Sequence, residues 1–177
     1  MGTPANPARL KLFCGIIFKD QHIAARAEAM LCRRFGKIDF QSQAFDFDQT
    51  TYYRDELGGG LKKRFVAFQK LILPDELPSI KLLTNRMEKK LSLAGRRLVN
   101  LDPGYLDLAK VVLASTKNYA HRVYLKKGIY AEMTLCYRGR SFQPWEWTYP
   151  DYRTEGYIAA FNQLRDLYAR QIKENRP

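Results

Sequence analysis

The chain has 177 residues, of which 46% are hydrophobic and 27% charged, with 30 lysines and arginines against 18 aspartates and glutamates. These proportions exclude a disordered chain, and the length favours one compact domain. The formal net charge of +12 favours negatively charged partners, although the basic residues are spread out and form no block typical of a nucleic-acid-binding tail.

The three cysteines, Cys14, Cys32 and Cys136, lie among apolar neighbours and form no CxxC pair. This pattern predicts free thiols rather than disulfides or a zinc site, so we expect a reducing compartment. The sequence has no signal-peptide pattern and no apolar run of about eighteen residues, the length that a membrane-spanning helix needs. We therefore expect a cytoplasmic protein that does not enter a membrane.

Residues 1–9 contain two prolines and small side chains, which predicts a flexible lead-in to a single α+β domain over 10–177. Apolar residues at both odd and even positions of 10–18 indicate a central strand that is covered on both faces. Asp20 is a suitable N-cap for a following helix, and Gly36 is a suitable stop for it.

Alternation of apolar and polar residues predicts a half-exposed strand at 38–44, and 64–72 is a further strand. Between them, 45–63 carries acidic and aromatic residues ahead of three glycines, which predicts a loop with one helical turn at 50–57. A second helix, with proline at its favoured early position, is predicted over 74–95.

A short strand at 96–101 completes the order β-α-β-β-α-β, which predicts two helices on one face of an antiparallel sheet. Residues 105–115 fit either a helix or a strand, and we favour a strand from residue 109. Strands at 119–125 and 129–138 form a hairpin, and Asp151 caps a last helix. The predicted fold is α+β, with a ferredoxin-like βαββαβ core extended by a C-terminal β-hairpin and a final helix.

The hairpin makes a specific prediction about pairing. A three-residue turn centred on Lys127 places Arg122 opposite Glu132, and Tyr124 opposite Tyr130. Alternation places these four side chains on the outer face and five apolar side chains on the core face. The five are Val123, Leu125, Ile129, Ala131 and Met133. The Arg122–Glu132 pair is then either a sheet-surface salt bridge or an anion site.

Polar residues of the types that bind ligands or transfer protons concentrate between residues 98 and 132, where apolar pairs and triplets separate them. We interpret them as a rim of polar side chains carried by buried elements. Asp102 and His121 are the candidate acid–base residues, although His121 is also explained as a half-buried histidine bonded to a backbone carbonyl. The candidate ligand-binding residues are Asn100, Tyr105, Lys110, Lys117, Arg122, Tyr124, Tyr130 and Glu132.

The segment from Asn100 to Tyr105 contains Asp-Pro-Gly, which predicts a turn that delivers Asn100 and Asp102 to the rim. Asp102 then either stabilises the turn through an Asx bond or acts as a general base or magnesium ligand. Asp46 and Asp48 are the further candidates for magnesium, and the sequence leaves the cofactor open.

The chain resembles a prokaryotic family of uncharacterised proteins, classed as a domain of unknown function. The segments that carry the resemblance are FGKIDFQSQAFDFDQTTYYRDELGGGLKKRF (35–65), RRLVNLDPGYLDLAKVVLASTKNYAHRVYLKKGIYAEMTL (96–135) and WTYPDYRTEGY (147–157). The resemblance implies one complete domain but no catalytic residue. Some members carry a GTP-binding label, which implies a nucleotide ligand, yet the glycines at 58–60 lack the GxxxxGK[ST] pattern of a phosphate loop.

We expect a domain that binds a small anionic ligand, such as a nucleotide or another phosphorylated molecule. The cations expected to meet the phosphate are Lys63, Lys110, Lys117 and Arg122. One alternative is an enzyme that acts on a phosphorylated substrate through acid–base chemistry by Asp102 and His121. Another is an RNA-binding or protein-interaction module, with Tyr124 and Tyr130 available for stacking on bases. Enzyme activity and oligomeric state stay open.

Overall fold

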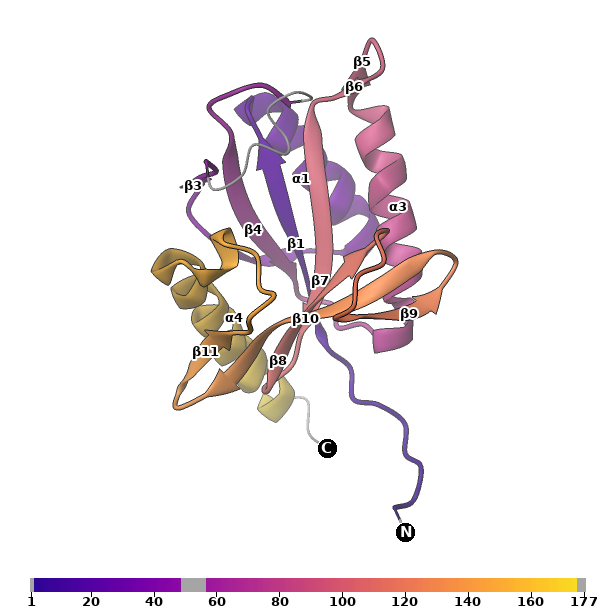
Figure 1. The fold of residues 1–177 in the computed structure, drawn as a ribbon, viewed down its shortest axis with the longest axis vertical. Coiled ribbons are helices and arrows are strands. Elements are labelled where there is room, and N and C mark those ends of the chain that lie inside the picture. The colour runs from indigo at the N-terminus through magenta and orange to yellow at the C-terminus, as the bar shows by residue number, and fades with distance from the viewer. Residues whose placement is uncertain (1, 49–56, 175–177) are drawn as a thin grey trace.

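The computed structural model describes residues 2–48 and 57–174, and one large antiparallel sheet organises them (Figure 1). Its strands are β1 (Lys11–Phe18), β2 (Ile38–Gln41), β3 (Phe45–Asp46), β4 (Lys62–Phe68), β7 (Val99–Leu106), β8 (Lys110–Ser115), β9 (Arg122–Lys126), β10 (Ile129–Arg138) and β11 (Ser141–Pro144). The strands β5 (Ser92–Leu93) and β6 (Arg96–Arg97) form a separate pair. The helices are α1 (Gln21–Phe35), α3 (Leu77–Lys90) and α4 (Glu155–Glu174), with 3-10 turns η1 (Pro74–Glu76) and η2 (Asp151–Arg153).

The order of strands along the sheet is β11-β10-β8-β7-β1-β4-β2, with β3 beside β4 and β9 beside β10. β1 lies between β4 and β7 and is antiparallel to both. All eight residues of β1 are buried, which confirms the predicted central strand. In a strand that is covered on both faces, neither the odd-numbered nor the even-numbered side chains meet solvent. This explains why apolar and polar residues do not alternate in its sequence.

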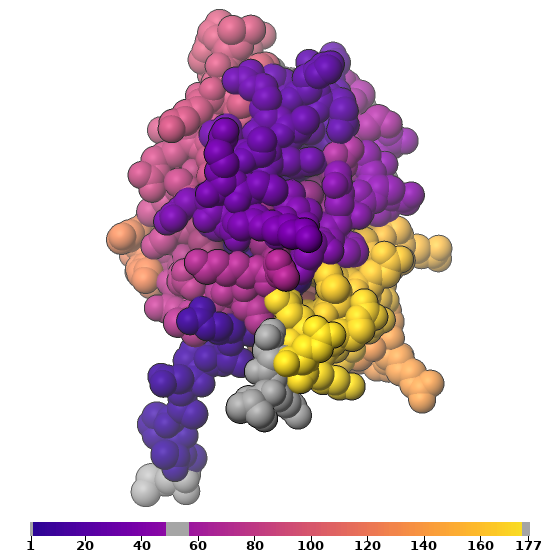
Figure 2. Space-filling view, turned by 180° about the vertical axis from the view of Figure 1, so that it is seen from behind, coloured from indigo at the N-terminus to yellow at the C-terminus, as the bar shows by residue number. Residues whose placement is uncertain are grey.

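Helices cover both faces of the sheet. α1 and α3 pack on one face, where Leu12, Ile16 and their neighbours form the larger apolar cluster. α4 packs on the other face against Phe13 and a set of aromatic rings. Figure 2 shows the molecule from behind, with the purple α1 region in the centre and α4 in yellow at the lower right. The sheet is therefore the middle of three layers.

Two local predictions for α1 are confirmed. The Asp20 carboxylate accepts a hydrogen bond from the main-chain N–H of His22 at 2.7 Å, as an N-cap should. Gly36 ends the helix with a φ of +93°, a backbone conformation that glycine adopts without strain. The second helix also begins where expected, at Pro74 in η1, but it ends at Lys90 because the following residues turn back as the β5–β6 pair.

The predicted turn at Asp-Pro-Gly is wrong, because Asp102, Pro103 and Gly104 lie inside β7. β8 pairs with β7 at Gly104, Tyr105 and Leu106, beyond Pro103, so a residue without an N–H is accommodated there. Gly104 is present for packing. A Cβ at this position would lie 2.5 Å from the Val112 carbonyl oxygen and 2.6 Å from Phe13 Cζ. The strand predicted to begin at residue 109 is confirmed, because β8 covers Lys110–Ser115.

The hairpin pairing is confirmed, although its turn differs from the prediction. Arg122 pairs with Glu132 and Tyr124 with Tyr130. The turn has two residues, Lys127 and Gly128, and both have positive φ, the geometry that suits the twist of two antiparallel strands. A register shift between Ile129 and Tyr130 restores the expected pairs.

The predicted faces of this hairpin are confirmed only in part, at the buried Ile129 and the exposed Tyr124. Val123, Leu125 and Met133 are 68%, 37% and 40% exposed, whereas Arg122 and Glu132 are buried. α3 covers this face only as far as the small cluster that contains Ile129, so the rest of the apolar face meets solvent. At the buried Arg122 the opposite, polar face is covered by Tyr149, whose hydroxyl accepts a hydrogen bond from this arginine. Alternation identified the two faces but could not show which one the rest of the chain would cover.

Other expectations have mixed outcomes. The final helix begins at Glu155, and Asp151 does not cap it but lies in η2 with its carboxylate bonded to Lys63. All three cysteines are free, as predicted. The helical turn expected at 50–57 falls almost entirely outside the described residues. Within the described part of the chain, no helix has the length and apolar character needed to cross a membrane.

The packing at Gly104 gives a testable prediction. Gly104→Ala should lower the free energy of unfolding by about 1–3 kcal/mol, because the new methyl group must displace a backbone carbonyl and a buried ring. The matched control is Gly59→Ala, where a Cβ meets nothing within 4 Å, and its effect should stay within about 0.5 kcal/mol. Urea denaturation of the three proteins measures both values, and equal stabilities would contradict the packing argument.

Candidate functional site

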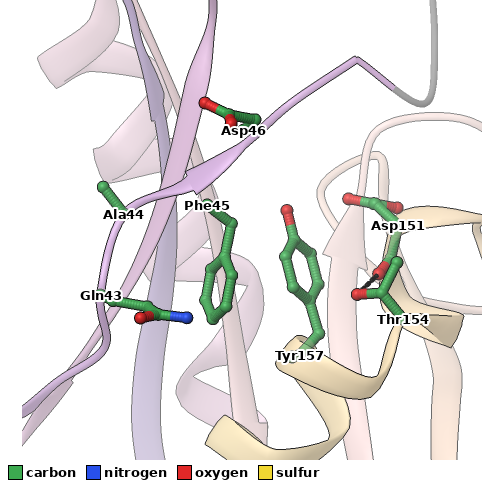
Figure 3. A pocket seen from close by; sticks show the side chains of 8 residues that line it. Gln43, Ala44, Phe45, Asp46, Asp151, Thr154 and Tyr157 are labelled. Carbon is green, nitrogen blue, oxygen red and sulfur yellow. Dashed lines mark hydrogen bonds between the residues drawn. The ribbon is translucent and has the colours of Figure 1, made fainter.

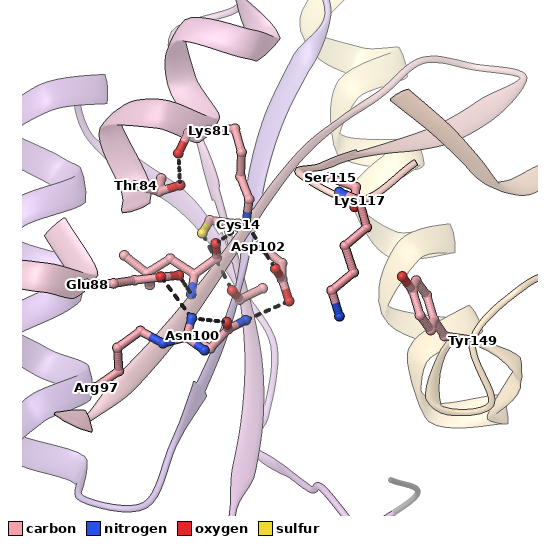
Figure 4. A network of polar contacts seen from close by, with 12 residues as sticks. Cys14, Lys81, Thr84, Glu88, Arg97, Asn100, Asp102, Ser115, Lys117 and Tyr149 are labelled. Carbon is pink, nitrogen blue, oxygen red and sulfur yellow. Dashed lines mark hydrogen bonds and ion pairs between the residues drawn. The ribbon is translucent and has the colours of Figure 1, made fainter. Parts of the chain in front are cut away.

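The candidate site lies where β7 and β8 separate. β8 leaves β7 after the pair Gly104–Leu113 and continues to Ser115 alongside β10. β7 in contrast stays paired with β1 as far as Val99. The two strands thus form a fork, with residues 99–103 on one branch and the end of β8 on the other. Polar side chains from both branches gather in this opening (Figure 4).

The open edge of β7 is completed by two charged side chains of α3. The Glu88 carboxylate accepts a hydrogen bond from the Leu101 N–H at 2.6 Å, and the Lys81 ammonium donates to the Leu101 carbonyl at 3.0 Å. These side chains replace the main-chain partners that β8 would have supplied. Because unpaired backbone groups are costly to bury, this arrangement ties α3 to the fork.

A connected set of polar side chains continues from this edge. Lys81 also donates to Asp102 at 3.2 Å, and the Asn100 amide donates to the other oxygen of Asp102 at 2.8 Å. Arg97 bonds to both Asn100 and Glu88 at 3.0 Å. We call these five residues the β7-edge network. Burial raises the pKa of the Glu88 carboxyl above its ordinary value of 4.5, although Lys81, the Leu101 N–H and Arg97 act in the opposite direction.

The second branch is organised by a buried arginine. Arg122 Nε donates to Glu132 at 2.8 Å, and Nη1 donates to the Ser115 hydroxyl at 2.8 Å and to the Lys117 carbonyl at 3.0 Å. Nη2 donates to the Tyr149 hydroxyl. The Arg122 and Glu132 side chains are only 2% and 1% exposed, so the interpretation as a surface salt bridge is wrong. Protein groups already occupy these donors, which leaves Arg122 as a structural residue.

His121 contacts the same carboxylate. Its Nε2 lies 3.2 Å from Glu132, in place of the backbone carbonyl considered from sequence. Its ring is also part of a column of nearly parallel rings, 6.0 Å from Tyr119 and 5.7 Å from Trp147, and Trp147 stacks in turn on Trp145. The imidazole thus lies among aromatic rings and beside the Glu132 carboxylate, which together hold its orientation.

Lys117 and Tyr149 lie across the opening from Asp102. In Figure 4 the Lys117 ammonium lies between the Asp102 carboxylate and the Tyr149 hydroxyl. Burial, assisted by the charge of Glu132, raises the pKa of the Tyr149 hydroxyl to about 12, so it stays protonated at neutral pH. Tyr149 is 43% exposed as a residue, although its hydroxyl end points inward to Arg122. Seen from this side, a cation, a carboxylate and a phenol thus face the opening (Figure 4).

The fork brings together six of the ten predicted site residues and leaves four elsewhere. Those at the fork are Asn100, Asp102, Lys117, His121, Arg122 and Glu132. Tyr105 packs on the α3 face, and Lys110 pairs with Asp107 at the other end of β8. Tyr124 and Tyr130 form an edge-to-face pair along the hairpin. Strand alternation and strand length carry these four away from the opening.

Sequence reasoning missed four residues of the site, namely Lys81, Glu88, Arg97 and Tyr149. Lys81 and Glu88 are seven positions apart on α3, a spacing that places both on one helix face, but charged residues on a helix normally indicate a solvated face. A signal was nevertheless present, because both lie within the apolar stripe that α3 buries.

Lys63 is also not placed to meet a phosphate. Its ammonium is buried 2.7 Å from Asp151 and lies 4.3 Å from the centre of the Tyr152 ring. The rings of Phe65 and Tyr157 lie 5.5 Å away. Aromatic faces and one carboxylate thus surround the charge, which makes Lys63 an anchor between the sheet and η2.

Beside this anchor is a cavity of about 380 Å³ (Figure 3). It lies between the start of α4 and β3, and its polar lining includes Gln43, Asp46, Asp151 and Thr154. The Tyr157 hydroxyl is buried and has no hydrogen-bond partner among the described residues. The exposed carboxylate of Asp46 and the buried one of Asp151 give this cavity a character that suits polar rather than anionic ligands.

The magnesium set considered from sequence is not assembled. Among residues 2–48 and 57–174, no group of three or more His, Cys, Asp and Glu side chains is placed to hold a metal ion. Asp46 lies beside Lys62 at the cavity near α4, whereas Asp102 belongs to the β7-edge network.

These features define an α+β protein whose polar site is built at a fork in one antiparallel sheet. The chain matches the model of a domain of unknown function, DUF4416, over residues 8–168, and it belongs to that family. The resemblance seen in the sequence is therefore confirmed. No curated protein and no solved structure matches the chain.

The buried ion pair at the fork makes a prediction about stability. Arg122→Met should lower the free energy of unfolding by about 3–5 kcal/mol, because it leaves the Glu132 charge buried without a partner. The control is Lys62→Met, which breaks an ion pair whose side chains are 50% and 83% exposed and should cost at most about 1 kcal/mol. Denaturant titrations of both variants check this, and similar losses would contradict the assigned role of Arg122.

The raised pKa of Glu88 predicts a dependence on pH. The fold favours the protonated carboxyl, so its stabilising contribution is complete below 4.5 and is lost as the pH rises through the raised value. The stability of the parent protein relative to Glu88→Gln should therefore fall over the range in which the pH rises above 4.5. Unfolding curves across this range measure the difference. A difference that grows with pH would show that the ion pairs outweigh burial.

Proposed function

We propose that this domain binds a small anionic ligand, such as a nucleotide or another phosphorylated molecule, at the fork between β7 and β8. The observation that carries the proposal is the position of Lys117 opposite Asp102 and Tyr149 (Figure 4). A ligand phosphate would meet the exposed Lys117 ammonium. The carboxylate of Asp102 has further acceptor capacity for a ligand hydroxyl or amine, beyond the bonds from Lys81 and Asn100.

The charge balance of the fork supports an anion. The four cationic side chains are Lys81, Arg97, Lys117 and Arg122, and the three carboxylates are Glu88, Asp102 and Glu132. Each carboxylate has a cation within 3.2 Å, so the carboxylates of the site are matched within the protein. The formal net charge of +12 raises the local concentration of anionic ligands around the whole domain.

An enzyme that acts on a phosphorylated substrate is the alternative proposal. His121 is held by Glu132 at 3.2 Å, a type of contact that orients an imidazole for proton transfer. Asp102 is bonded on the other branch, so the two residues would act from opposite sides of the opening. If a turnover is found, Asp102→Asn and His121→Ala should each reduce it, and unchanged rates would reject this assignment.

We also propose a ferredoxin-like description for residues 11–106. The four longest strands of this region lie in the order β7-β1-β4-β2 with antiparallel neighbours, and α1 and α3 share one apolar cluster on one face. The order along the chain, β-α-β-β-α-β with β3, β5 and β6 as additional short strands, supports the same description.

Ligand binding is tested by isothermal titration calorimetry with ATP, GTP and inorganic phosphate, each with and without magnesium. We expect at least one phosphorylated compound to bind, and Lys117→Glu to weaken that binding by about tenfold or more through charge repulsion. Asp102→Asn should weaken a nucleotide more than inorganic phosphate, because only the nucleotide has groups that donate to the carboxylate.

The matched control is Lys173→Glu, which makes the same charge change at an exposed residue near the end of α4. It should leave binding within about twofold, since a distant surface charge is screened by salt. Absence of any binding, or an equal loss in Lys117→Glu and Lys173→Glu, would overturn the proposed site. Binding of single-stranded RNA in the same assay, with no small-molecule binding, would favour a nucleic-acid partner instead.

A further inference from the structure

A hollow lies on the face of the sheet that α1 and α3 cover, opposite the face that carries the cavity beside α4. It is formed between the end of α1 and the start of α3. Its volume is about 350 Å³, near the lower limit of ordinary ligand pockets, which span roughly 300–1,000 Å³. Its floor is apolar and consists of Phe35, Ile72, Ile80 and Leu83. Ile72 and Ile80 belong to the main apolar cluster, with Phe35 and Leu83 packed against it, so the floor is backed by the rigid core.

Three cations surround this apolar floor. Arg34 comes from the end of α1, Lys70 from the loop after β4, and Lys126 from the tip of the β9–β10 hairpin. All three are exposed, and none forms an ion pair or side-chain hydrogen bond with another described residue. The fold therefore concentrates positive charge from three distant parts of the sequence around one hollow, where the charges repel one another unless an anion is present.

Two carboxylates also line the hollow, but one of them is engaged elsewhere. Glu76 accepts a hydrogen bond from the Leu73 N–H at 2.8 Å and so serves the start of η1. Asp75 is exposed in the same first turn, where a negative charge interacts favourably with the helix N-terminus. The three cations thus outnumber the two carboxylates.

We propose that this hollow binds an amphiphilic anion, a small molecule with a phosphate, sulfonate or carboxylate head and an alkyl or aryl body. The head would contact Lys126, Lys70 and Arg34, and the body would cover the exposed parts of Phe35 and Leu83. An inorganic ion would leave the apolar floor in water, and a neutral lipid would leave the cations without a partner. Only a ligand with both parts satisfies both features. The site is separate from the fork and does not depend on ligand binding there.

The test uses the fluorescence of the anionic aromatic probe 8-anilinonaphthalene-1-sulfonate with the full-length protein. We expect saturable binding that octyl phosphate displaces and that neither inorganic phosphate nor the neutral octyl glucoside displaces. Lys126→Glu should weaken probe binding by about tenfold, because it replaces a cation of the rim with an anion. The matched control is Lys127→Glu, which makes the same change at the adjacent residue of the turn, outside the hollow. Lys127→Glu should leave the affinity within about twofold.

The exposed hairpin face around Val123 is a competing site for the same probe. Val123→Ser should leave the affinity unchanged if the hollow binds the probe. The proposal is overturned if probe binding does not saturate, if octyl glucoside competes as well as octyl phosphate, or if Lys126→Glu and Lys127→Glu behave alike. It is also overturned if Val123→Ser alone removes the signal. The variants change exposed residues, and melting curves verify that each is folded.

Discussion

The separation of β7 from β8 after Gly104 is the constraint on which the candidate site depends. Had the strands stayed paired, the main-chain groups of Leu101 would have bonded to β8. They bond instead to Glu88 and Lys81 on α3, and Lys81 continues to Asp102. One helix thus supplies part of the apolar core and also completes the edge of the sheet. Any movement of α3 would leave buried backbone groups unpaired, so the position of the helix and the shape of the opening are coupled.

Buried charge has a similar role elsewhere in the molecule. The Arg122–Glu132 pair lies under the Tyr149 segment, and Lys63 joins β4 to Asp151 in η2. Such pairs add little net stability compared with apolar packing, but each is costly to break once buried. They therefore select one arrangement of the C-terminal segment over others. The hydrogen bonds of the β7-edge network are made within the protein, whereas the cations of the hollow near α3 form no ion pair with another described residue.

Part of the candidate site was predictable. Six of the ten residues predicted from the polar stretch between 98 and 132 lie at the fork, and pairing rules placed Arg122 opposite Glu132. The α3 residues Lys81 and Glu88 were not predictable in the same way. On a helix, charged side chains usually face water, and nothing local indicates that the neighbouring strand will lack a partner at Leu101. The same limitation applies to the hairpin, since alternation defines two faces without showing which one will be covered.

The amino-acid sequence by itself determined the elements with strong local causes. The buried strand β1, the capped helix α1 and the β9–β10 pairs follow from burial pattern, capping and turn chemistry, which act over a few residues. Only the tertiary structure decided that Asp-Pro-Gly continues a strand, because the space around Gly104 is filled by Phe13 and Val112 from other strands. The same holds for both proposed binding sites. Their residues come from distant segments, and the energy that brings them together is that of packing and of buried polar groups across the whole sheet.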